Sequence, residues 1–407
     1  MKTPQYNDYF PLAEYEQRIA RIREQIISHG LDAVLLTTQP NVDYSSGFLH
    51  GTWSPAFGQG TVQVLITATD EPPVLFAPSG LQALFVTSAL SDIRATSDAD
   101  YGTSPSDFYD VFKAKNLLNG KIGIEQSKED LMGLSYPLFC AMKEKMPNVV
   151  FKDCSALMYD VRKTKSPLEV EKIRQAVSIT SRSLEVALPQ IREGMSEVEL
   201  ANLVAQEMAK HTDEGAARNP WFIFVYADGK SPTAWDGIPS SYRFAKGDCI
   251  YVDCGAVYHG YHSDIIRIAS IGQASDAKQR IYYGARDANM ALIKHMKPGM
   301  RISQLCDFLS ETMIDLGFAS EVQMMRKFGG MYEGHGIGLS IHEAPMIKRD
   351  NKDVLQAGMT LAIEGNIFDN LPLSKTTIAL KNEENVLITS GGCELLSTLP
   401  NDIWVAK

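Results

Sequence analysis

Apolar residues near the start of the chain recur at the spacing of an amphipathic helix. One helix face would hold four apolar side chains, those of Tyr15, Ile19, Ile22 and Ile26. Gly30 stands where such a helix would end. Short β-type runs follow between polar and Gly/Pro-rich turns, at residues 33–37, 61–67, 74–77 and 121–125. This pattern predicts a mixed α/β domain, and its strand runs carry neither a phosphate loop nor a metal-ligand cluster.

A helix-start signal marks a change of character near residue 162. The basic link of residues 162–165 is followed by Ser166 as a helix N-cap and Pro167 at the first helical position. Glu169 stands three residues after the cap, where it completes a capping box. We therefore expect an N-terminal domain over residues 1–161 and a C-terminal domain over residues 162–407.

The second domain contains an internal repeat of helix, helix and strand. One long helix is predicted to end at 192–195 and another at 297–300, and second helices are predicted over 196–211 and 302–316. Each half then has a glycine that leads into an apolar strand, with Asp253 or Glu364 at the same distance after the glycine. The matched carboxylates favour a pseudo-two-fold sheet with its site on the axis. Chance similarity of two amphipathic units is the alternative.

Composition narrows the class of protein without changing this organisation. Lys and Arg number 39 against 49 Asp and Glu, a formal net charge of −10, so no basic surface invites nucleic acid or anionic lipid. No run approaches the roughly 18 apolar residues of a membrane span, and the N-terminus lacks the apolar core of a secretory signal. The 6 cysteines include no CxxC pair, which is typical of reduced thiols. We expect a soluble cytoplasmic enzyme.

Five residues of the second domain could carry chemistry together, namely Asp253, Asp264, His335, Glu364 and Glu383. Asp253 would end an apolar strand, and a turn through Gly255 and Gly260 would bring Asp264 beside it in a hairpin. Glu364 and Glu383 repeat this arrangement in the second half. Four clustered carboxylates need a compensating charge, which two divalent cations with one imidazole would supply. The ligand set suits Mn²⁺, Fe²⁺, Co²⁺ or Zn²⁺ in a two-metal site.

The histidine of this set lies in the glycine-rich segment GHGIG at residues 334–338. Alternating glycines let the backbone approach closely and turn sharply. The GxGxxG spacing of nucleotide binding and the GxSxG of serine hydrolases are both absent. His342, further along, is either a substrate-side hydrogen-bonding group or a capping or buried structural histidine. His259 and His262 are better explained as turn residues than as ligands.

With these motifs together, the chain resembles the pita-bread metallopeptidases, which comprise prolidases (Xaa-Pro dipeptidases), aminopeptidase P and methionine aminopeptidases, with the metal-free creatinases as relatives. The resemblance covers nearly the whole chain and is carried by RKTKSPLEVEKIR at 162–174, VDCG at 252–255, SDIIR at 263–267, GHGIGLSIHEAP at 334–345, AIEG at 362–365 and KNEENV at 381–386. All five metal-ligand positions are present, which disfavours creatinase. The resemblance implies an α/β (α+β) fold, with a creatinase-like N-terminal domain and a C-terminal pita-bread domain with a pseudo-two-fold repeat.

The resemblance also implies a division of the metal ligands. Asp253 would chelate one ion and His335 with Glu364 the other, while Asp264 and Glu383 would bridge the two. Mn²⁺ is the first expectation for these two divalent ions, with Co²⁺, Zn²⁺ or Fe²⁺ as alternatives. A water made acidic by both ions would then attack the scissile carbonyl.

Roles in catalysis and assembly follow from the same resemblance. Glu364 would carry protons, and His342 would help to bind substrate or to steady the tetrahedral intermediate. The layout of two domains implies a homodimer, in keeping with the closed two-fold symmetry of most oligomers. A peptide or another small molecule is expected as the substrate, and neither nucleic acid nor a membrane is expected as a partner.

Three positions depart from the family's pattern. Asp236 stands 17 residues before Asp253, where the peptidases place a histidine near the substrate carbonyl. Met331 takes the place of another frequent histidine, and Phe368 that of a frequent tyrosine. The leading interpretation is a metal-dependent Xaa-Pro dipeptidase or aminopeptidase, with Asp236 among its catalytic residues. The alternative is a non-peptidase enzyme on the same scaffold, either a hydrolase of small cationic amidines or cyclic compounds or a metal-dependent lyase. A binding module without activity is disfavoured by the complete ligand set.

Overall fold

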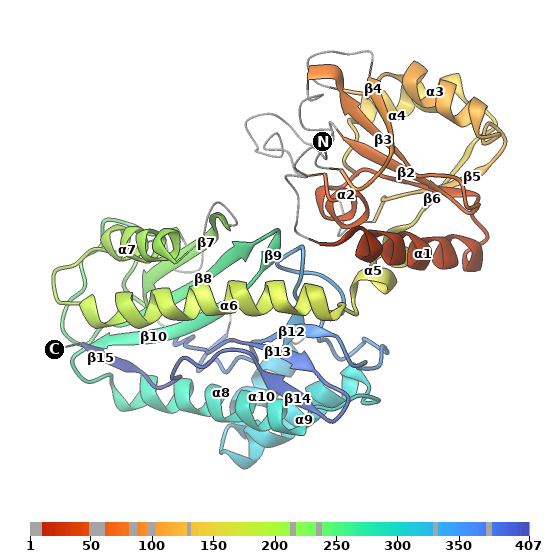
Figure 1. Cartoon of the computed structure of the whole chain (residues 1–407). Helices are drawn as coiled ribbons and strands as arrows, with labels where there is room; N and C mark the ends of the chain where they lie inside the picture. The colour runs from red at the N-terminus through yellow and green to blue at the C-terminus, as the bar shows by residue number, and fades with distance from the viewer. Residues whose placement is uncertain are drawn as a thin grey trace. The chain divides into compact units, whose positions relative to one another are not determined.

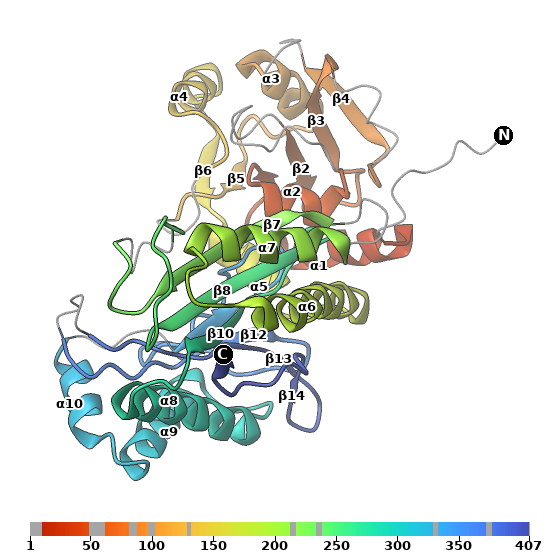
Figure 2. The same ribbon diagram turned by 90° about the vertical axis from the view of Figure 1, so that its left-hand side faces the viewer.

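The computed structural model describes residues 10–48, 62–80, 88–96, 102–127, 132–211, 217–232, 238–328, 333–371 and 377–406. The chain divides into two compact units, residues 1–162 and 163–407. Figure 1 colours both units in chain order, and Figure 2 gives a second view of the same ribbon. Within the described part of the chain, no helix combines the length and the apolar character needed to cross a membrane.

The first unit is built on a mixed β-sheet with helices packed against it (Figure 1). Its strands are β1 (Ala33–Leu36), β2 (Gln63–Thr67), β3 (Val74–Pro78), β4 (Asp92–Thr96), β5 (Lys121–Ile124) and β6 (Val150–Asp153). Its helices are α1 (Leu12–Ser28), α2 (Gln39–Ser46), α3 (Pro105–Ala114), α4 (Tyr136–Lys145) and α5 (Ser155–Arg162). The described strands lie in the order β4-β3-β2-β1-β5-β6, with β1 antiparallel to β2 and parallel to β5.

The apolar pattern of this unit predicts its central elements correctly. The predicted N-terminal helix is α1, whose Ile22 and Ile26 are fully buried, and Gly30 follows it with φ of 62°. The four predicted strand runs correspond to β1, β2, β3 and β5. By contrast, β4 and β6 were not predicted, because most of their side chains are exposed and the apolar signal is lost.

The second unit begins with two helices that start where the sequence predicts. Its helices are α6 (Pro167–Ala187), α7 (Glu197–Lys210), α8 (Asp276–His295), α9 (Ile302–Asp315) and α10 (Ala319–Lys327). Its strands are β7 (Ala217–Ala227), β8 (Cys249–Tyr258), β9 (Tyr261–His262), β10 (Ile265–Ile271), β11 (Gly334–Gly336), β12 (Thr360–Ile363), β13 (Glu384–Ile388), β14 (Cys393–Leu395) and β15 (Trp404–Ala406). Ser166 and Ser196 both form capping boxes, and the one at Ser166 is the capping box that the sequence predicts.

The strands of the second unit form two sheets that meet at one point. The described strands of the first sheet run β15-β10-β8-β7 with β9 on β8, and those of the second run β11-β12-β13-β14. An isolated bridge between Ile266 and Glu383 joins β10 to the start of β13. Helix α6 packs on β8 and α7 on β7, while apolar side chains of α8 and α9 share a core with β12 and β13 (Figure 1). The junction of the two sheets therefore lies between two layers of helices.

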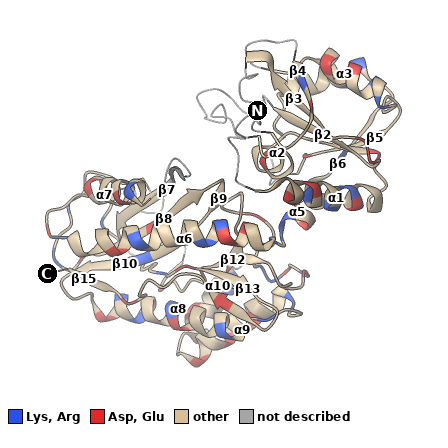
Figure 3. Cartoon of the chain, viewed as in Figure 1, with Lys and Arg blue, Asp and Glu red and all other residues tan. Residues whose placement is uncertain are grey.

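The two halves of this unit share a succession of two helices followed by a central strand, as the repeat predicts. The succession α6, α7, β8 in the first half corresponds to α8, α9, β12 in the second. The first helix of each half ends earlier than predicted, at Ala187 and His295, and in the first half a 3₁₀ turn over Leu188–Gln190 follows. Residues of both charge signs occur along α1, α6 and α8 (Figure 3), which is unlike the single-sign stripe of a nucleic-acid-binding protein.

The prediction that Asp253 ends a strand is wrong. Strand β8 continues through Asp253 to Tyr258, so the carboxylate projects from the middle of the strand. Gly255 is not a turn residue either, because it lies within β8, where a Cβ would lie 1.8 Å from the backbone oxygen of Ser263. The turn lies at Gly260, which has φ of 85°.

Candidate metal centre

Five polar side chains from both sheets converge where the sheets meet. They are Asp253 in β8, Asp264 just before β10, His335 in β11, Glu364 just after β12 and Glu383 just before β13. The ligand atoms of His335, Glu364 and Glu383 lie within 4.8 Å of one another, and so do those of Asp253, Asp264 and Glu383. The structure thus brings together all five residues that the sequence singles out, with Glu383 common to both groups.

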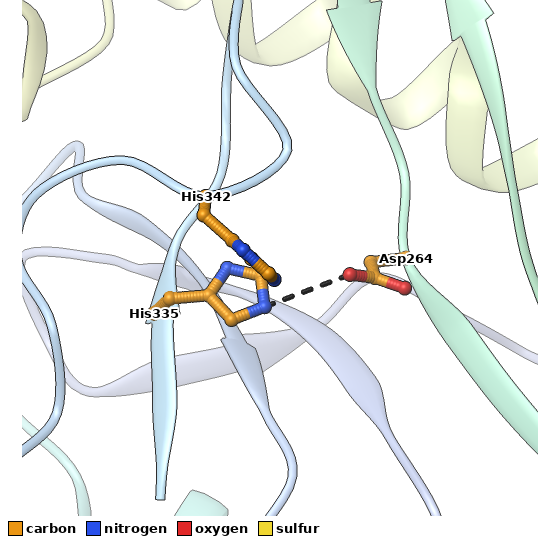
Figure 4. A group of neighbouring side chains, drawn as sticks. All are labelled: Asp264, His335 and His342. Carbon is orange, nitrogen blue, oxygen red and sulfur yellow. Dashed lines mark ion pairs between the residues drawn. The ribbon is translucent and has the colours of Figure 1, made fainter. Parts of the chain in front are cut away.

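His335 lies at the centre of the carboxylates. Its Nε2 atom is 3.5 Å from an oxygen of each of Asp264, Glu364 and Glu383. Its Nδ1 atom lies 3.0 Å from the carbonyl oxygen of Gly336, which suits an Nδ1–H donor. The neutral ring would then present the Nε2 lone pair to a metal ion, because the backbone bond selects the tautomer. Figure 4 shows this ring beside Asp264 and the ring of His342.

The glycines around His335 permit the close approach that the sequence predicts. A Cβ at Gly334 would lie 2.2 Å from the carbonyl oxygen of Ala362 on the paired strand β12. A Cβ at Gly336 would lie 2.4 Å from the carbonyl oxygen of Ala344. Any side chain at either position would push β11 away from its neighbours and carry His335 out of the carboxylate cluster.

The electrostatics of the cluster show a lack of positive charge. Burial, reinforced by neighbouring carboxylates, raises the pKa of Asp264 to about 7 and that of Glu383 to about 8. Burial and Glu383 also raise the pKa of Asp253 well above its ordinary value. For His335, burial alone would lower the pKa, but contacts with Asp264 and Glu383 raise it well above its ordinary value. Without a cation, Glu383 would hold a proton at neutral pH and Asp264 would be near half protonation.

Several oxygens of the cluster also lack hydrogen-bond donors. The buried atoms Oδ1 of Asp253, Oδ1 of Asp264, Oε1 of Glu364 and Oε1 of Glu383 accept no hydrogen bond from the described residues. A buried acceptor left in this way costs about 1–3 kcal/mol. Convergent carboxylate oxygens with one imidazole nitrogen are a donor set for divalent cations. The residues present therefore fit divalent metal ions.

Lys381 is a member of the site that our sequence reasoning missed. Its ammonium forms an ion pair with Oε2 of Glu364, and its side chain is 19% exposed. Burial alone would lower its pKa, but Glu364, Glu383 and Asp253 raise it. The available signal was its position two residues before Glu383, because alternate residues of an extended chain point to the same face.

Residues next to the ligands hold them in place. The side-chain amide of Asn385 exchanges two hydrogen bonds of 2.8 Å with the backbone of Asp264. The guanidinium of Arg267 donates to the carbonyl oxygen of Glu383 at 3.2 Å and pairs with Glu384 at 2.8 Å. Glu384 is therefore buried together with its partner, since its side chain is 1% exposed in this ion pair.

The remaining candidates fall into four groups. His342 joins Asp264 and His335 in a third group of potential ligand atoms, with its ring centroid 4.1 Å from that of His335. His259 and His262 belong to none of the ligand groups found among the described residues, and His259 has the positive φ of a turn, 49°. Phe368 is buried at 3% exposure. Asp236 and Met331 lie outside the described residues.

A two-sheet unit with such a carboxylate centre defines a metal-dependent enzyme, and comparison with known proteins gives its class. Residues 171–390 match metallopeptidase family M24, and residues 18–164 match the creatinase/prolidase N-terminal domain. The sequence is 26% identical to the Xaa-Pro dipeptidase of Pyrococcus horikoshii over 95% of this chain and 98% of that protein. It is 29% identical to the Xaa-Pro dipeptidase of Pyrococcus furiosus over 73% of this chain and 78% of that one.

A solved structure shares the architecture of the whole chain. The Xaa-Pro dipeptidase of Bacillus anthracis superposes with a TM-score of 0.80 at 24% identity, covering 96% of this chain and 99% of that one. The protein belongs to metallopeptidase family M24, with a creatinase-like N-terminal domain. The family resemblance, the α/β fold and the assignment as a metal-dependent peptidase are thereby confirmed, and the non-peptidase alternative is not favoured. Membership of this family also implies that divalent metal ions act in the reaction.

Proposed function

We propose that the enzyme is an Xaa-Pro dipeptidase or aminopeptidase that cleaves the bond before proline. The substrate class is carried over from the two Pyrococcus relatives, both of which are Xaa-Pro dipeptidases. The observation that supports the chemistry is the convergence of acceptor oxygens and one imidazole nitrogen within 4.8 Å. Hydrolysis of an amide bond needs an activated water and a stabilised oxyanion, and this centre is suited to both.

In this proposal, two divalent ions are held by Asp253, Asp264, His335, Glu364 and Glu383. We take Mn²⁺ as the first candidate because the donors are mostly carboxylate oxygens, with Co²⁺, Zn²⁺ and Fe²⁺ as alternatives. When bound, such ions supply a water of lowered pKa and polarise the scissile carbonyl. Two divalent cations would also balance the charge of four carboxylates, and so oppose the burial and the mutual repulsion that raise the pKa of Asp264 and Glu383.

Two side chains would handle protons and the developing charge. Glu364 takes up the proton of the attacking water and returns it to the leaving nitrogen, with Lys381 against its other oxygen to fix the carboxylate. His342 lies on the exposed side of the cluster beside His335. Burial and His335 lower the pKa of His342 to about 4, so that a neutral ring donates one N–H to the substrate oxygen.

The experiment that tests the function is a substrate panel on metal-reconstituted protein. Xaa-Pro dipeptides, longer Xaa-Pro peptides and Xaa-Ala controls would be assayed with Mn²⁺, Co²⁺ or Zn²⁺ after chelator treatment. Cleavage that requires a divalent ion and the prolyl residue supports the proposal. Full activity in chelator-treated protein would contradict it, as would equal turnover of prolyl and alanyl substrates.

Asp236 would affect the rate at which the enzyme cleaves prolyl substrates. An ionised aspartate accepts hydrogen bonds but cannot donate one to a carbonyl or oxyanion. The loss of one such donor typically costs about 100- to 1000-fold in rate. We therefore expect slow turnover of prolyl dipeptides, and a faster rate for Asp236→His. Cleavage that is indifferent to both Asp236→His and Asp236→Ala would show that this position does not act on the substrate.

We further propose that the enzyme is a cytoplasmic homodimer. Buried free thiols such as Cys249, Cys254 and Cys306 are compatible with a reducing compartment. Closed two-fold dimers are the commonest assembly of soluble proteins. Light scattering at micromolar concentration should give about twice the chain mass of 45.0 kDa, and a particle of the single-chain mass would contradict the dimer.

A further inference from the structure

A buried ion pair lies beside the segment that carries His335 and His342. Nζ of Lys165 is 2.6 Å from Oε1 of Glu343, and the two side chains are 2% and 4% exposed. Removing one partner of such a pair is strongly destabilising, yet a well-packed apolar pair is often equally stable. Stability alone therefore gives no reason for charged residues at these two positions.

The lysine is anchored by its backbone to the strand that precedes Glu364. Its backbone N–H donates to the carbonyl oxygen of Gly358 at 2.9 Å, and Thr164 forms a β-bridge with Met359. Strand β12 begins at the next residue and ends directly before Glu364. The backbone of Lys165 is therefore fixed beside β12, the strand that ends directly before Glu364.

The glutamate is tied by its backbone to the residue that follows His335. The N–H of Glu343 donates to the carbonyl oxygen of Gly336 and the N–H of Gly336 donates to that of Glu343, both at 3.0 Å. His342 immediately precedes Glu343, and its ring lies at 73° to the ring of His335. The position of Glu343 therefore sets the position of His342 over the cluster.

The sequence leaves room for this pair at Gly338. A Cβ there would lie 2.5 Å from Oε1 of Glu343 and 2.9 Å from Cε of Lys165. The last glycine of GHGIG is thus explained by the ion pair and not by a bound ligand.

We propose that Lys165 is a positioning residue of the active site, which acts through Glu343 to hold His342 against the metal centre. The catalytic part of this inference rests on the proposed function, in which His342 donates to the substrate oxygen. The contacts described for the ammonium of Lys165 are with Glu343 and with the carbonyl oxygen of Lys163, and they include no metal-ligand atom. Its effect should fall on the transition state and leave metal binding unchanged.

The test compares Lys165→Met with the double variant Lys165→Met/Glu343→Gln. In Lys165→Met, hydrogen exchange at the amides of Gly336 and Glu343 should accelerate, and kcat for an Xaa-Pro dipeptide should fall about 10- to 100-fold. KM should change less than about threefold, and metal content per chain should stay at the wild-type value. The double variant no longer buries an unpaired charge, so it should regain thermal stability without regaining kcat.

Arg174→Met is the matched control, because Arg174 in α6 also pairs with a glutamate, Glu394, but at a half-exposed site. It should leave exchange and kcat at wild-type values. Recovery of kcat together with stability in the double variant would overturn the proposal, as would wild-type exchange at both amides in Lys165→Met. The exchange measurement needs no turnover. Wild-type protein that cleaves no prolyl peptide would therefore refute the proposed function separately from the positioning role.

Discussion

Two buried carboxylates, one in each unit, have opposite surroundings. Glu125 directly follows β5 and is fully buried, and its oxygens accept hydrogen bonds from the backbone and hydroxyl groups of Thr37 and Thr38 and from the amide of Asn41, at 2.8–3.3 Å. Glu383 directly precedes β13 and is 2% exposed, but its Oε1 has no donor among the described residues and lies among other carboxylates.

The difference teaches that burial of an acid does not by itself mark a site. Glu125 lies near the N-terminal end of α2, where neutral donors and the helix dipole stabilise a negative charge without any ion. The pKa of Glu383 is raised by burial and by Asp264, which means that its negative charge is not stabilised by the protein alone. The first carboxylate is structural, whereas the second needs an external cation.

The largest effect should come from removing a member of the centre. In Glu383→Ala or His335→Ala, metal content per chain should fall, because each side chain belongs to a ligand group. Activity should fall by at least about 1000-fold, equivalent to roughly 4 kcal/mol of transition-state stabilisation. Circular dichroism should show that the fold is kept. Metal analysis and kcat/KM measure the effect, and a variant with normal metal content and activity would remove that residue from the centre.

The free energy of unfolding of the metal-free protein should depend on pH, because the carboxylate cluster lacks a compensating positive charge. Asp264 and Glu383 have a pKa of about 7 and about 8 in the metal-free folded state, against roughly 4 in an unfolded chain. Between these values the folded chain binds more protons than the unfolded chain, so the free energy of unfolding should fall as the pH rises. Below about pH 4 both states are protonated and this loss disappears.

Metal ions should cancel that loss. At a free metal concentration of about 100 times Kd, the free energy of unfolding rises by about 2.7 kcal/mol. Because protons compete for the same oxygens, this gain should be larger at pH 8 than at pH 5.5. Urea unfolding with chelator or with Mn²⁺ at several pH values measures both trends. A metal-free protein that became more stable from pH 5.5 to pH 8 would contradict the proposed charge balance.

A smaller loss is expected from Lys381, which provides a fixed positive charge that Glu125 does not need. In Lys381→Met, Glu364 loses the ion pair that orients its carboxylate, and kcat should fall about 10- to 100-fold. Metal content should stay near the wild-type value, since the five ligands remain. Lys381→Arg, which keeps the charge, is the matched control and should retain more activity. Equal kcat in the two variants would show that the charge at this position does not matter.

Much of this architecture could be predicted because local signals coincide with tertiary ones. The capping box at Ser166, the glycines around His335 and the apolar run ending before Glu364 are each specified by neighbouring residues. The spacing of the acids in a repeated unit then predicts that they meet. The family resemblance, which is carried by motifs around the same residues, points to the same ligand set.

The errors arise where distant contacts decide the structure. Glycine is typical of turns, but pairing with Phe222 on β7 makes Gly255 a strand residue, and Asp253 therefore lies within β8. Glu384 is of a residue type that is usually exposed, but Arg267 from β10 pairs with it in the interior. Lys381 was overlooked because no local pattern shows which carboxylate a lysine will meet.

The smallest effect on activity is expected from Glu125, and it completes the comparison. In Glu125→Gln, one acceptor oxygen becomes an NH₂ group that faces donors of Thr37 or Thr38. Leaving buried donors without an acceptor costs about 1–3 kcal/mol in the free energy of unfolding, which urea titration would measure. Metal content and kcat/KM should stay at wild-type values, because the hydrogen bonds described for this carboxylate all come from neutral groups of the first unit. Loss of metal in Glu125→Gln would mean that the two buried carboxylates are not independent, and the distinction between a structural acid and a metal ligand would fail for this pair.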